Sequence, residues 1–308
     1  MATPSVLVFA TGGTIGMHET DTGLAPDPDF PEVLEGLVAG ICGPLGVEAR
    51  INHLLPAIDS ANADADTAPR IARAISARVR THRPRGVVIL HGTDAMEETA
   101  LLVGIQHRAA KPVIFTGAQF AADSAAPDGP RNLADALAAA LGAPGVSLVF
   151  GGRQLPAWGL YKAASDRADA FALAGDGHPA LPDLPGSVAG IRVDLVAIHP
   201  GVDALHLDAS ITAGARGIVL AALGSGNASP EIVAATARAH AAGIPVVVSS
   251  RVPQGVLEPA YGGGGGGHDL GLAGAIHSRL LRPGQARILL AALIASNAST
   301  SQIAAAFA

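Results

Sequence analysis

Threonines follow two strongly apolar stretches of the chain, and glycines accompany each of them. Residues 6–10 lead into Thr11-Gly12-Gly13-Thr14, and residues 87–90 lead into His91-Gly92-Thr93-Asp94. A threonine hydroxyl attacks a carbonyl carbon when a base lies within hydrogen-bond reach, and glycine-rich backbone offers amide donors to the oxyanion that forms. The pair of motifs therefore predicts a site for acyl transfer rather than two turns capped by threonine.

The use of lysine indicates a base for such chemistry. The chain has two lysines, Lys111 and Lys162, among 20 lysine and arginine residues. An ammonium group can lose its proton when it is desolvated, whereas a guanidinium cannot. Lys111 precedes a proline at the start of an apolar run and is expected to be solvated. Lys162 follows the apolar run 146–150 on the side of the threonines and is the candidate base.

Two further polar residues are candidates for holding a charged ligand. Asp94 adjoins Thr93 and either binds an ammonium group or caps the following helix. Ser60 lies in a polar stretch at 58–62 and either binds a carboxylate through its hydroxyl or is a turn serine. The local sequence leaves both interpretations open for each residue.

Apolar, β-branched runs alternate with alanine-rich segments along most of the chain, which is typical of repeated βα units in a parallel sheet. Ligands of such sheets bind outside the carboxyl ends of the strands, where both threonine motifs lie. Strands are predicted at 5–10, 87–91, 112–116, 146–150, 194–198, 216–222 and 244–249, and helices at 66–81 and 97–108.

The length of 308 residues favours two domains, each with its own core. Glycine, proline and aspartate cluster between 174 and 190, which is typical of a linker. We expect a larger N-terminal α/β catalytic domain at 1–175 with a mostly parallel sheet flanked by helices, a linker at 176–192, and a smaller C-terminal parallel α/β domain at 193–308. The six glycines at 262–267 predict a flexible loop, with an anion-binding nest as the alternative.

Composition excludes several classes of protein. Hydrophobic residues make up 49% of the chain, charged residues 15%, and the net charge is −6, which favours a compact, self-associating protein without a nucleic-acid partner. The single Cys42 and the spacing of the histidines predict neither a disulfide nor a metal site. No apolar stretch reaches about 20 residues and no basic leader opens the chain, so we expect a cytoplasmic protein with no membrane partner.

Taken together, these motifs resemble the bacterial-type L-asparaginase and glutaminase-asparaginase family, in order over nearly the whole chain. Segments 9–16 (FATGGTIG) and 90–94 (LHGTD) look like the two signatures of that family. Supporting matches lie at 59–60, 115–118, 128–133, 224–227 and 249–255. The family fold of two α/β domains, the first one larger, agrees with the division expected from composition.

The resemblance implies that Thr14 is the nucleophile. It would attack the side-chain amide of L-asparagine, forming a β-aspartyl acyl-enzyme and releasing ammonia, and water would then release L-aspartate. Thr93, Lys162 and Asp94 would form a second hydrogen-bonded set that activates a nucleophile. The resemblance implies no cofactor, and it is compatible with minor glutaminase activity.

The resemblance also implies how the amino-acid substrate is bound. Ser60 would hold the α-carboxylate, Asp94 the α-ammonium group and the carbonyl of Ala118 the leaving nitrogen, while the amides around Thr93 would help to stabilise the oxyanion. Asn227 would reach the active site of a neighbouring subunit. A homodimer or a homotetramer follows from that contact.

The chain departs from the family pattern in its lid. Ungapped alignment from Thr14 places Leu24 where the family carries a tyrosine that hydrogen-bonds the nucleophile. The two tyrosines are Tyr161, beside Lys162, and Tyr261. The other departures alter the wall of the pocket, at Ala61, Ala95 and Gln119-Phe120. In the family a neighbouring subunit donates an acidic residue, and Glu258 is the nearest candidate for it in this chain.

Other functions remain as alternatives. A binding or regulatory protein that kept this scaffold would bind asparagine without releasing ammonia, and a related amidase would act on another amide. The amidotransferase subunit that acts with tRNA shares the domain but has a longer chain with an added N-terminal module. A nucleotide-binding Rossmann protein is disfavoured because 11–16 lacks the G-x-G-x-x-G spacing and the chain has no P-loop.

Overall fold

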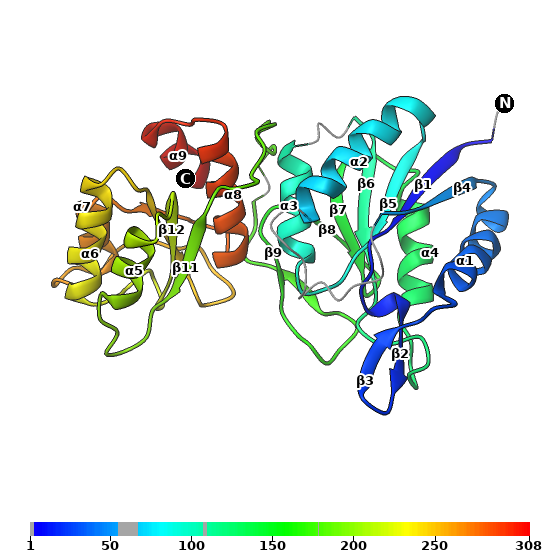
Figure 1. Ribbon diagram of the computed structural model, residues 1–308, viewed down its shortest axis with the longest axis horizontal. Helices are drawn as coiled ribbons and strands as arrows, with labels where there is room; N and C mark the ends of the chain where they lie inside the picture. The colour runs from blue at the N-terminus through cyan, green and yellow to red at the C-terminus, as the bar shows by residue number, and fades with distance from the viewer. Residues whose placement is uncertain (1–2, 55–66, 107–109, 178) are drawn as a thin grey trace. The chain divides into compact units, whose positions relative to one another are not determined.

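The computed structural model describes residues 3–54, 67–106, 110–177 and 179–308, which form two compact units (Figure 1). The N-terminal unit comprises Met1–Ala157 and Lys162–Ala172, and the C-terminal unit comprises Trp158–Tyr161 and Leu173–Ala308. The chain thus passes between the units at 157, 161 and 172. The division expected from the sequence, with a linker at 176–192 between two domains, stays a prediction.

The N-terminal unit is built on a six-stranded sheet of order β4-β1-β5-β6-β7-β8. Five neighbouring strands run parallel: β4 (Glu48–His53), β1 (Ser5–Ala10), β5 (Gly86–Leu90), β6 (Pro112–Thr116) and β7 (Gly145–Phe150). The last strand, β8 (Arg153–Pro156), turns back antiparallel to β7. The four strands predicted in this unit are confirmed to within one residue at each end.

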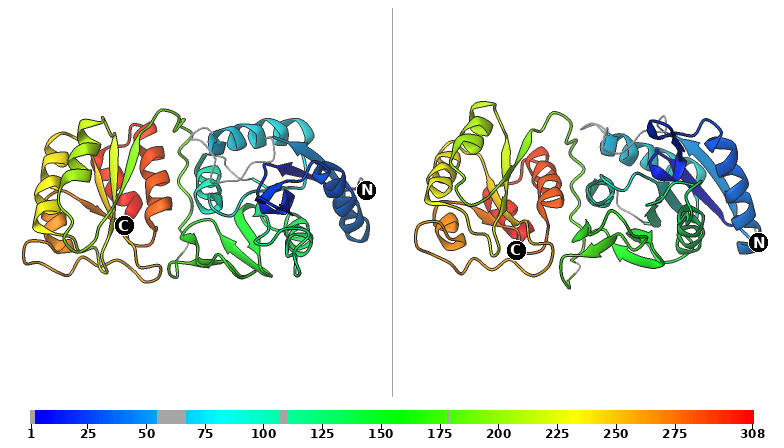
Figure 2. Two further views of the ribbon diagram at one scale, coloured as in Figure 1. Left: turned by 60° about the horizontal axis from the view of Figure 1, so that its bottom comes forward. Right: turned by 90° about the horizontal axis from the view of Figure 1, so that it is seen from below.

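Helices cover both faces of this sheet (Figures 1 and 2). The helices α1 (Phe30–Leu45) and α4 (Gly129–Ala139) share one apolar core with alternate residues of β1, such as Val6 and Val8. The intervening Leu7 and Phe9 are equally buried and point to the opposite face, where α2 (Thr67–His82) packs on α3 (Met96–Gln106). Burial on both faces explains why these strands read as continuous apolar runs.

Two small sheets of two strands each stand apart from the main sheet. The strands β2 (Met17–Thr20) and β3 (Gly23–Pro26) form a hairpin directly after the short helix η1 (Thr14–Gly16). The strands β9 (Leu160–Lys162) and β10 (Phe171–Leu173) form a ribbon that carries Lys162. The sequence predicted neither element, because each is too short to show an apolar period.

The C-terminal unit holds a parallel sheet of order β11-β12-β13-β14, formed by Val193–Ala197, Gly217–Ala222, Val246–Ser250 and Ile276–His277. One face packs on α5 (Leu205–Thr212), α6 (Pro230–Ala241) and α7 (Gly267–Leu272). The helix α8 (Pro283–Ala295) contacts the same strands on the other side, and α9 (Thr300–Phe307) contacts β14 (Figure 2). The three predicted strands are confirmed to within two residues, and so is the two-part α/β fold class.

The run of glycines before α7 is closed by an acidic side chain. Asp269 Oδ2 accepts hydrogen bonds from the backbone N–H groups of Gly264 and Gly266, at 2.7 and 2.9 Å. The amides that an anion-binding nest would use are therefore occupied by a carboxylate of the chain itself.

Candidate active site

The loop after β1 is fixed to the neighbouring strand by Thr11. Its hydroxyl donates to the carbonyl of Leu90 at 2.8 Å, its backbone N–H donates to the same carbonyl at 3.0 Å, and the residue is buried. Gly12 and Gly13 follow with φ of 106° and 97°, where a side chain would be strained. They turn the chain into η1, which begins at the half-buried Thr14.

The loop after β5 lies directly against this turn. The backbone of Gly92 packs on Gly13 so closely that no side chain fits between them. His91 is buried, its Nδ1–H donates to the carbonyl of Gly92 at 2.8 Å, and burial lowers the pKa of its imidazole. His91 therefore stays neutral and shapes the turn, while Thr93 stands at the edge of the sheet beside the motif that holds Thr14.

The loop after β6 forms the third wall of the site. Asn132 is 1% exposed, and its Nδ2 donates to the carbonyl of Gly117 and to Asp128 Oδ2, both at 3.0 Å. Its Oδ1 accepts the backbone N–H of Gly151, beyond the end of β7, at 3.0 Å. One buried amide thus ties the loops after β6 and β7 together and fixes the backbone next to Ala118.

Lys162 reaches across to Thr93 and Asp94. Its Nζ donates to Thr93 Oγ1 and to Asp94 Oδ1, each at 2.7 Å. The side chain of Lys162 is 19% exposed and that of Asp94 is 55% exposed, so the lysine is largely buried and the carboxylate is open to solvent. Because Thr93 Oγ1 accepts from Nζ, its own proton is free to point toward a ligand or a water molecule.

Glu97, on the first turn of α3, belongs to this cluster and was missed by the sequence analysis. Its Oε2 accepts the backbone N–H of Lys162. Burial raises the pKa of Glu97 to about 7, and the charge of Glu98 adds to that rise, against the opposing hydrogen bond and charge of Lys162. A glutamate three residues after Asp94 is the signal in the sequence, but acidic residues are common in the first turn of a helix for other reasons.

The structure brings most of the predicted site residues to one edge of the N-terminal sheet. Thr93, Asp94 and Lys162 are joined by hydrogen bonds, and the turn that carries Thr14 packs on Gly92. Ala118 is fully buried, and its Cβ lies against Gly129, which also contacts Ile15 beside the predicted nucleophile. The sequence motifs therefore converge as the carboxyl ends of parallel strands require.

Two of the remaining predicted residues belong to the C-terminal unit, and one is not described by the structure. Asn227 belongs to the C-terminal unit, where its Oδ1 accepts the backbone N–H of Gly267 at 3.1 Å. Glu258 pairs with Arg279 in the same unit at 2.7 Å. Ser60, predicted to bind a carboxylate, lies outside the described residues.

The two tyrosines and the residue aligned with the lid tyrosine have different surroundings. Leu24 projects from the hairpin on β3 and is 51% exposed. Tyr161 is buried in the C-terminal unit, and Tyr261 is 59% exposed. The hairpin thus presents an aliphatic side chain where the family pattern expects a phenol.

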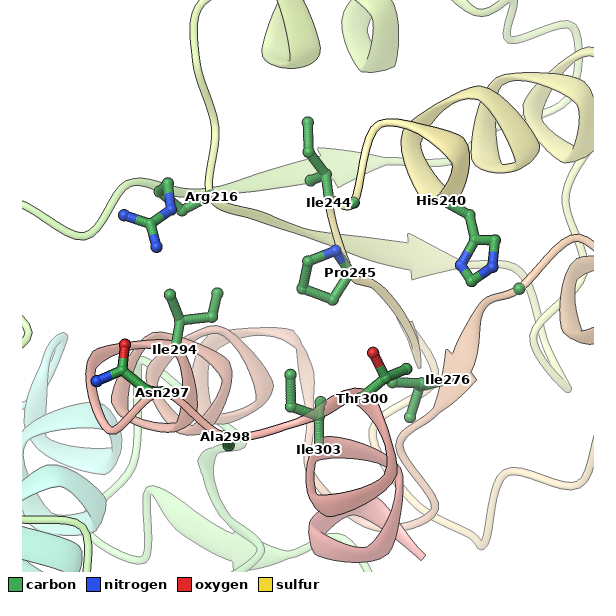
Figure 3. A pocket seen from close by; sticks show the side chains of 12 residues that line it. Arg216, His240, Ile244, Pro245, Ile276, Ile294, Asn297, Ala298, Thr300 and Ile303 are labelled. Atoms are coloured by element: carbon green, nitrogen blue, oxygen red, sulfur yellow. The ribbon is translucent and has the colours of Figure 1, made fainter.

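A hollow of about 350 Å³ lies in the C-terminal unit, near the amino ends of the strands of its sheet (Figure 3). Arg216 and Pro245 directly precede β12 and β13. Across the hollow they face Ile294 of α8, Asn297 in the link between α8 and α9, and residues of α9. None of the predicted site residues lines this hollow. Its place at the amino ends also separates it from the carboxyl-end position typical of ligand sites in such sheets.

The polar groups at the edge of the N-terminal sheet suit acyl transfer. They comprise hydroxyls, a lysine amine, a carboxylate and glycine-flanked backbone amides, which are the parts of a nucleophile, its activating set and an oxyanion site. Within the described residues, no group of three histidine, cysteine or acidic side chains is placed to hold a metal ion. In the same described part of the chain, no helix is long and apolar enough to cross a bilayer.

Fold and site together define a two-part α/β protein with a polar centre at the carboxyl ends of a parallel sheet. The chain belongs to the asparaginase family: the model of the asparaginase N-terminal domain matches residues 5–184, and that of the glutaminase/asparaginase C-terminal domain matches residues 192–307. The family resemblance inferred from the motifs is thereby confirmed.

Individual relatives match along most of their length. A probable L-asparaginase of Deinococcus radiodurans is 32% identical, over 97% of this chain and 96% of that protein. L-asparaginase 2 of Bacillus subtilis is 26% identical, over 93% and 81% respectively. The crystal structure of a probable cytoplasmic L-asparaginase from Campylobacter jejuni superposes with a TM-score of 0.82 at 25% identity, covering 99% of both chains.

Proposed function

We propose that this protein hydrolyses L-asparagine to L-aspartate and ammonia in the cytoplasm. The observation that carries the proposal is the contact of Lys162 Nζ with both Thr93 Oγ1 and Asp94 Oδ1, beside the turn that bears Thr14. Membership of the asparaginase family and the names of the relatives support the choice of substrate.

In the proposed first step, Thr14 is the nucleophile. Its hydroxyl oxygen attacks the side-chain amide carbon, and the hydroxyl proton passes to the leaving nitrogen. The C–N bond then breaks, ammonia departs and a β-aspartyl ester of Thr14 remains. Backbone amides around Thr93 lie next to Gly13 and stabilise the oxyanion, a role for which glycine-flanked amides are suited.

In the second step, water attacks the ester and Thr14 regains its proton. Thr93 is placed to direct that water, because Lys162 donates to its oxygen and leaves its proton free. Asp94 orients the Lys162 amine from the other side. Every step uses groups of the chain and water, so the proposal requires no metal and no cofactor.

Binding of the amino acid draws on additional residues. Asp94 holds the α-ammonium group, Ser60 the α-carboxylate, and the carbonyl of Ala118 the leaving nitrogen. Asn227 is supplied by a neighbouring subunit, so the active form is a homodimer or a homotetramer. Its Nδ2 group is the part available for that contact, since Oδ1 already accepts from Gly267. A minor glutaminase activity fits the same set of contacts.

Ammonia release by the purified protein tests the proposal directly. L-asparagine, L-glutamine and D-asparagine are compared for the wild type and for Thr14→Val, which keeps the shape of the side chain and removes its hydroxyl. Release from L-asparagine that falls by about 10³-fold or more in the variant supports a Thr14 nucleophile. Equal release by both proteins would assign the nucleophile to another group.

A second candidate function is suggested by the exposed Leu24. The β2–β3 hairpin offers no hydroxyl at this position to hydrogen-bond Thr14, which favours a homologue that binds the amino acid without turning it over. Calorimetric binding of L-asparagine with no ammonia release would identify this case. Binding of neither asparagine nor glutamine would point to an amidase with another substrate.

A further inference from the structure

Glu97 connects the helix after the second threonine motif to the strand that bears Lys162. The carboxylate oxygen Oε2 accepts the backbone N–H of Lys162, while the lysine amine reaches Thr93 and Asp94, which lie just before the same helix. Lys162 is thus held at both of its ends by one short segment, residues 93–97. Both partners belong to the N-terminal unit.

The backbone of Lys162 needs such a support. Strand β9 has three residues and pairs with β10 in a ribbon apart from the main sheet. A lysine side chain has four rotatable bonds, so a small displacement of its backbone moves the amine away from two partners that are each 2.7 Å distant. Glu97 is the side chain that links this strand to the rigid start of α3.

We infer that Glu97 is a positioning residue, which holds the backbone of Lys162 and thereby sets the amine against Thr93 and Asp94, with its own ionisation tuning the rate of turnover. The rate part of the inference rests on the proposed function, whereas the structural part does not.

The electrostatic surroundings explain why the ionisation matters near neutral pH. Burial raises the pKa of Glu97 to about 7, helped by Glu98 and opposed by Lys162. Asp94 accepts a hydrogen bond from the lysine amine. Of the elements packed on α3, strand β7 carries no charged residue. Helix α2 carries basic residues, but its four arginines are exposed and its histidine is half-buried, and none of them contributes to the raised pKa of Glu97; they are Arg70, Arg73, Arg78, Arg80 and His82.

The sign of the effect follows from the hydrogen bond. An ionised carboxylate accepts an N–H more strongly than a neutral carboxyl group does. Above pH 7 Glu97 therefore holds Lys162 more firmly and adds a second negative charge near its amine. Below pH 7 the hold weakens, so kcat is expected to rise as the pH increases through about 7.

A nuclear magnetic resonance titration tests the structural part without any substrate. Because the chain has two lysines, ¹⁵N-lysine labelling gives two backbone amide signals, and Lys111 serves as the internal reference. The Lys111→Arg variant assigns the remaining signal to Lys162. The Lys162 amide proton is expected to move downfield with a midpoint near pH 7, to lose this titration in Glu97→Gln, and to keep it in Glu98→Gln.

Rate profiles from pH 5.5 to 8.5 test the functional part. The variant Glu97→Gln keeps an acceptor oxygen but cannot ionise, so its kcat is expected to stay flat at the low-pH level of the wild type, about 3–10-fold below the wild type at pH 8, with KM little changed. Glu98→Gln is expected to keep the inflection at a slightly lower pH. Glu97→Ala, which removes the acceptor, is expected to lose more activity at every pH.

The possible results are separable. A Lys162 amide that does not titrate, or that still titrates in Glu97→Gln, overturns the inference whatever the enzyme assay gives. An unchanged rate inflection in Glu97→Gln overturns the tuning of turnover. Absence of ammonia release by the wild type contradicts the proposed function alone, since the amide titration still decides the role of Glu97.

Discussion

Gly13 and Gly92 meet backbone to backbone: a Cβ added to Gly13 would stand 2.5 Å from the Cα of Gly92 and 2.6 Å from its nitrogen. Real Cβ atoms do not approach other backbone atoms so closely. The close approach of the two threonine motifs therefore requires that Gly13 has no side chain.

Gly13→Ala is expected to destabilise the protein and to separate Thr14 from Thr93. The clash with Gly92 and the positive φ of 97° together predict a loss of about 2–4 kcal/mol in the free energy of unfolding. Urea denaturation followed by circular dichroism measures it. Gly145→Ala is the matched control, because Gly145 has φ of 135° but a Cβ there meets nothing within 4 Å. Equal losses in the two variants would attribute the effect to backbone strain alone.

Lys162→Met is expected to lower kcat by about 10²–10⁴-fold, the range typical of an active-site acid or base. Methionine fills similar space but cannot donate to Thr93 Oγ1 or Asp94 Oδ1. Steady-state ammonia release gives the measurement. Lys111→Met is the control, since the Lys111 amine donates to the carbonyl of Pro84 at the far end of the sheet. Near-normal turnover by Lys162→Met would leave this lysine a structural role only.

Mixed oligomers test whether Asn227 serves a neighbouring active site. Asn227→Asp keeps an acceptor for the N–H of Gly267 but loses the Nδ2 donor, so turnover is expected to fall about 10-fold. Co-expressing this variant with Thr14→Val makes dimers in which one site combines an intact Thr14 with an intact Asn227. About a quarter of the wild-type activity should then return, because half of the dimers are mixed and half of their sites are whole.

Two other results would contradict that arrangement. Activity no greater than the average of the two separate variants would mean that Asn227 acts within its own subunit or not at all. A monomer in light scattering, with full activity, would exclude a shared site altogether.

The sequence predicted the strands well because buried parallel strands are apolar on both faces. Strand β5, for example, is buried at every residue, and its sequence GVVIL contains no polar side chain. Strand β4 was missed because its residues alternate between half-buried and exposed and include Glu48, Arg50 and His53. The β2–β3 hairpin was missed because each of its strands has only four residues, most of them exposed, which is too short for an apolar period.

The site could be predicted only in part for a related reason. The carboxyl ends of parallel strands lie at one end of the sheet, which placed Thr14 and Thr93 together from topology, whereas Ala118 was placed only by the family resemblance. The hydrogen bond between Lys162 and Thr93 was expected from the rarity of lysine and from the family resemblance. The β9–β10 ribbon that carries Lys162, 69 residues further along the chain, was not predicted, because no local pattern encodes it. Glu97 was not predicted, because its role depends on its burial. The sequence does not show whether a glutamate in the first turn of a helix is buried or exposed.

The hydrogen bonds of the Asn132 side chain bear on the length of the side chain that the proposed site can accept. By joining Gly117 to Gly151, it makes the carboxyl ends of β6 and β7 a single stiff wall behind Ala118. Among the described residues, the β2–β3 hairpin is linked to the loop after β6 by one hydrogen bond to a side chain, in which the backbone N–H of Glu19 donates to Asp123 Oδ2. For the reaction proposed above, we therefore expect a side chain one methylene longer than that of asparagine to be accommodated by movement of the hairpin rather than of this wall.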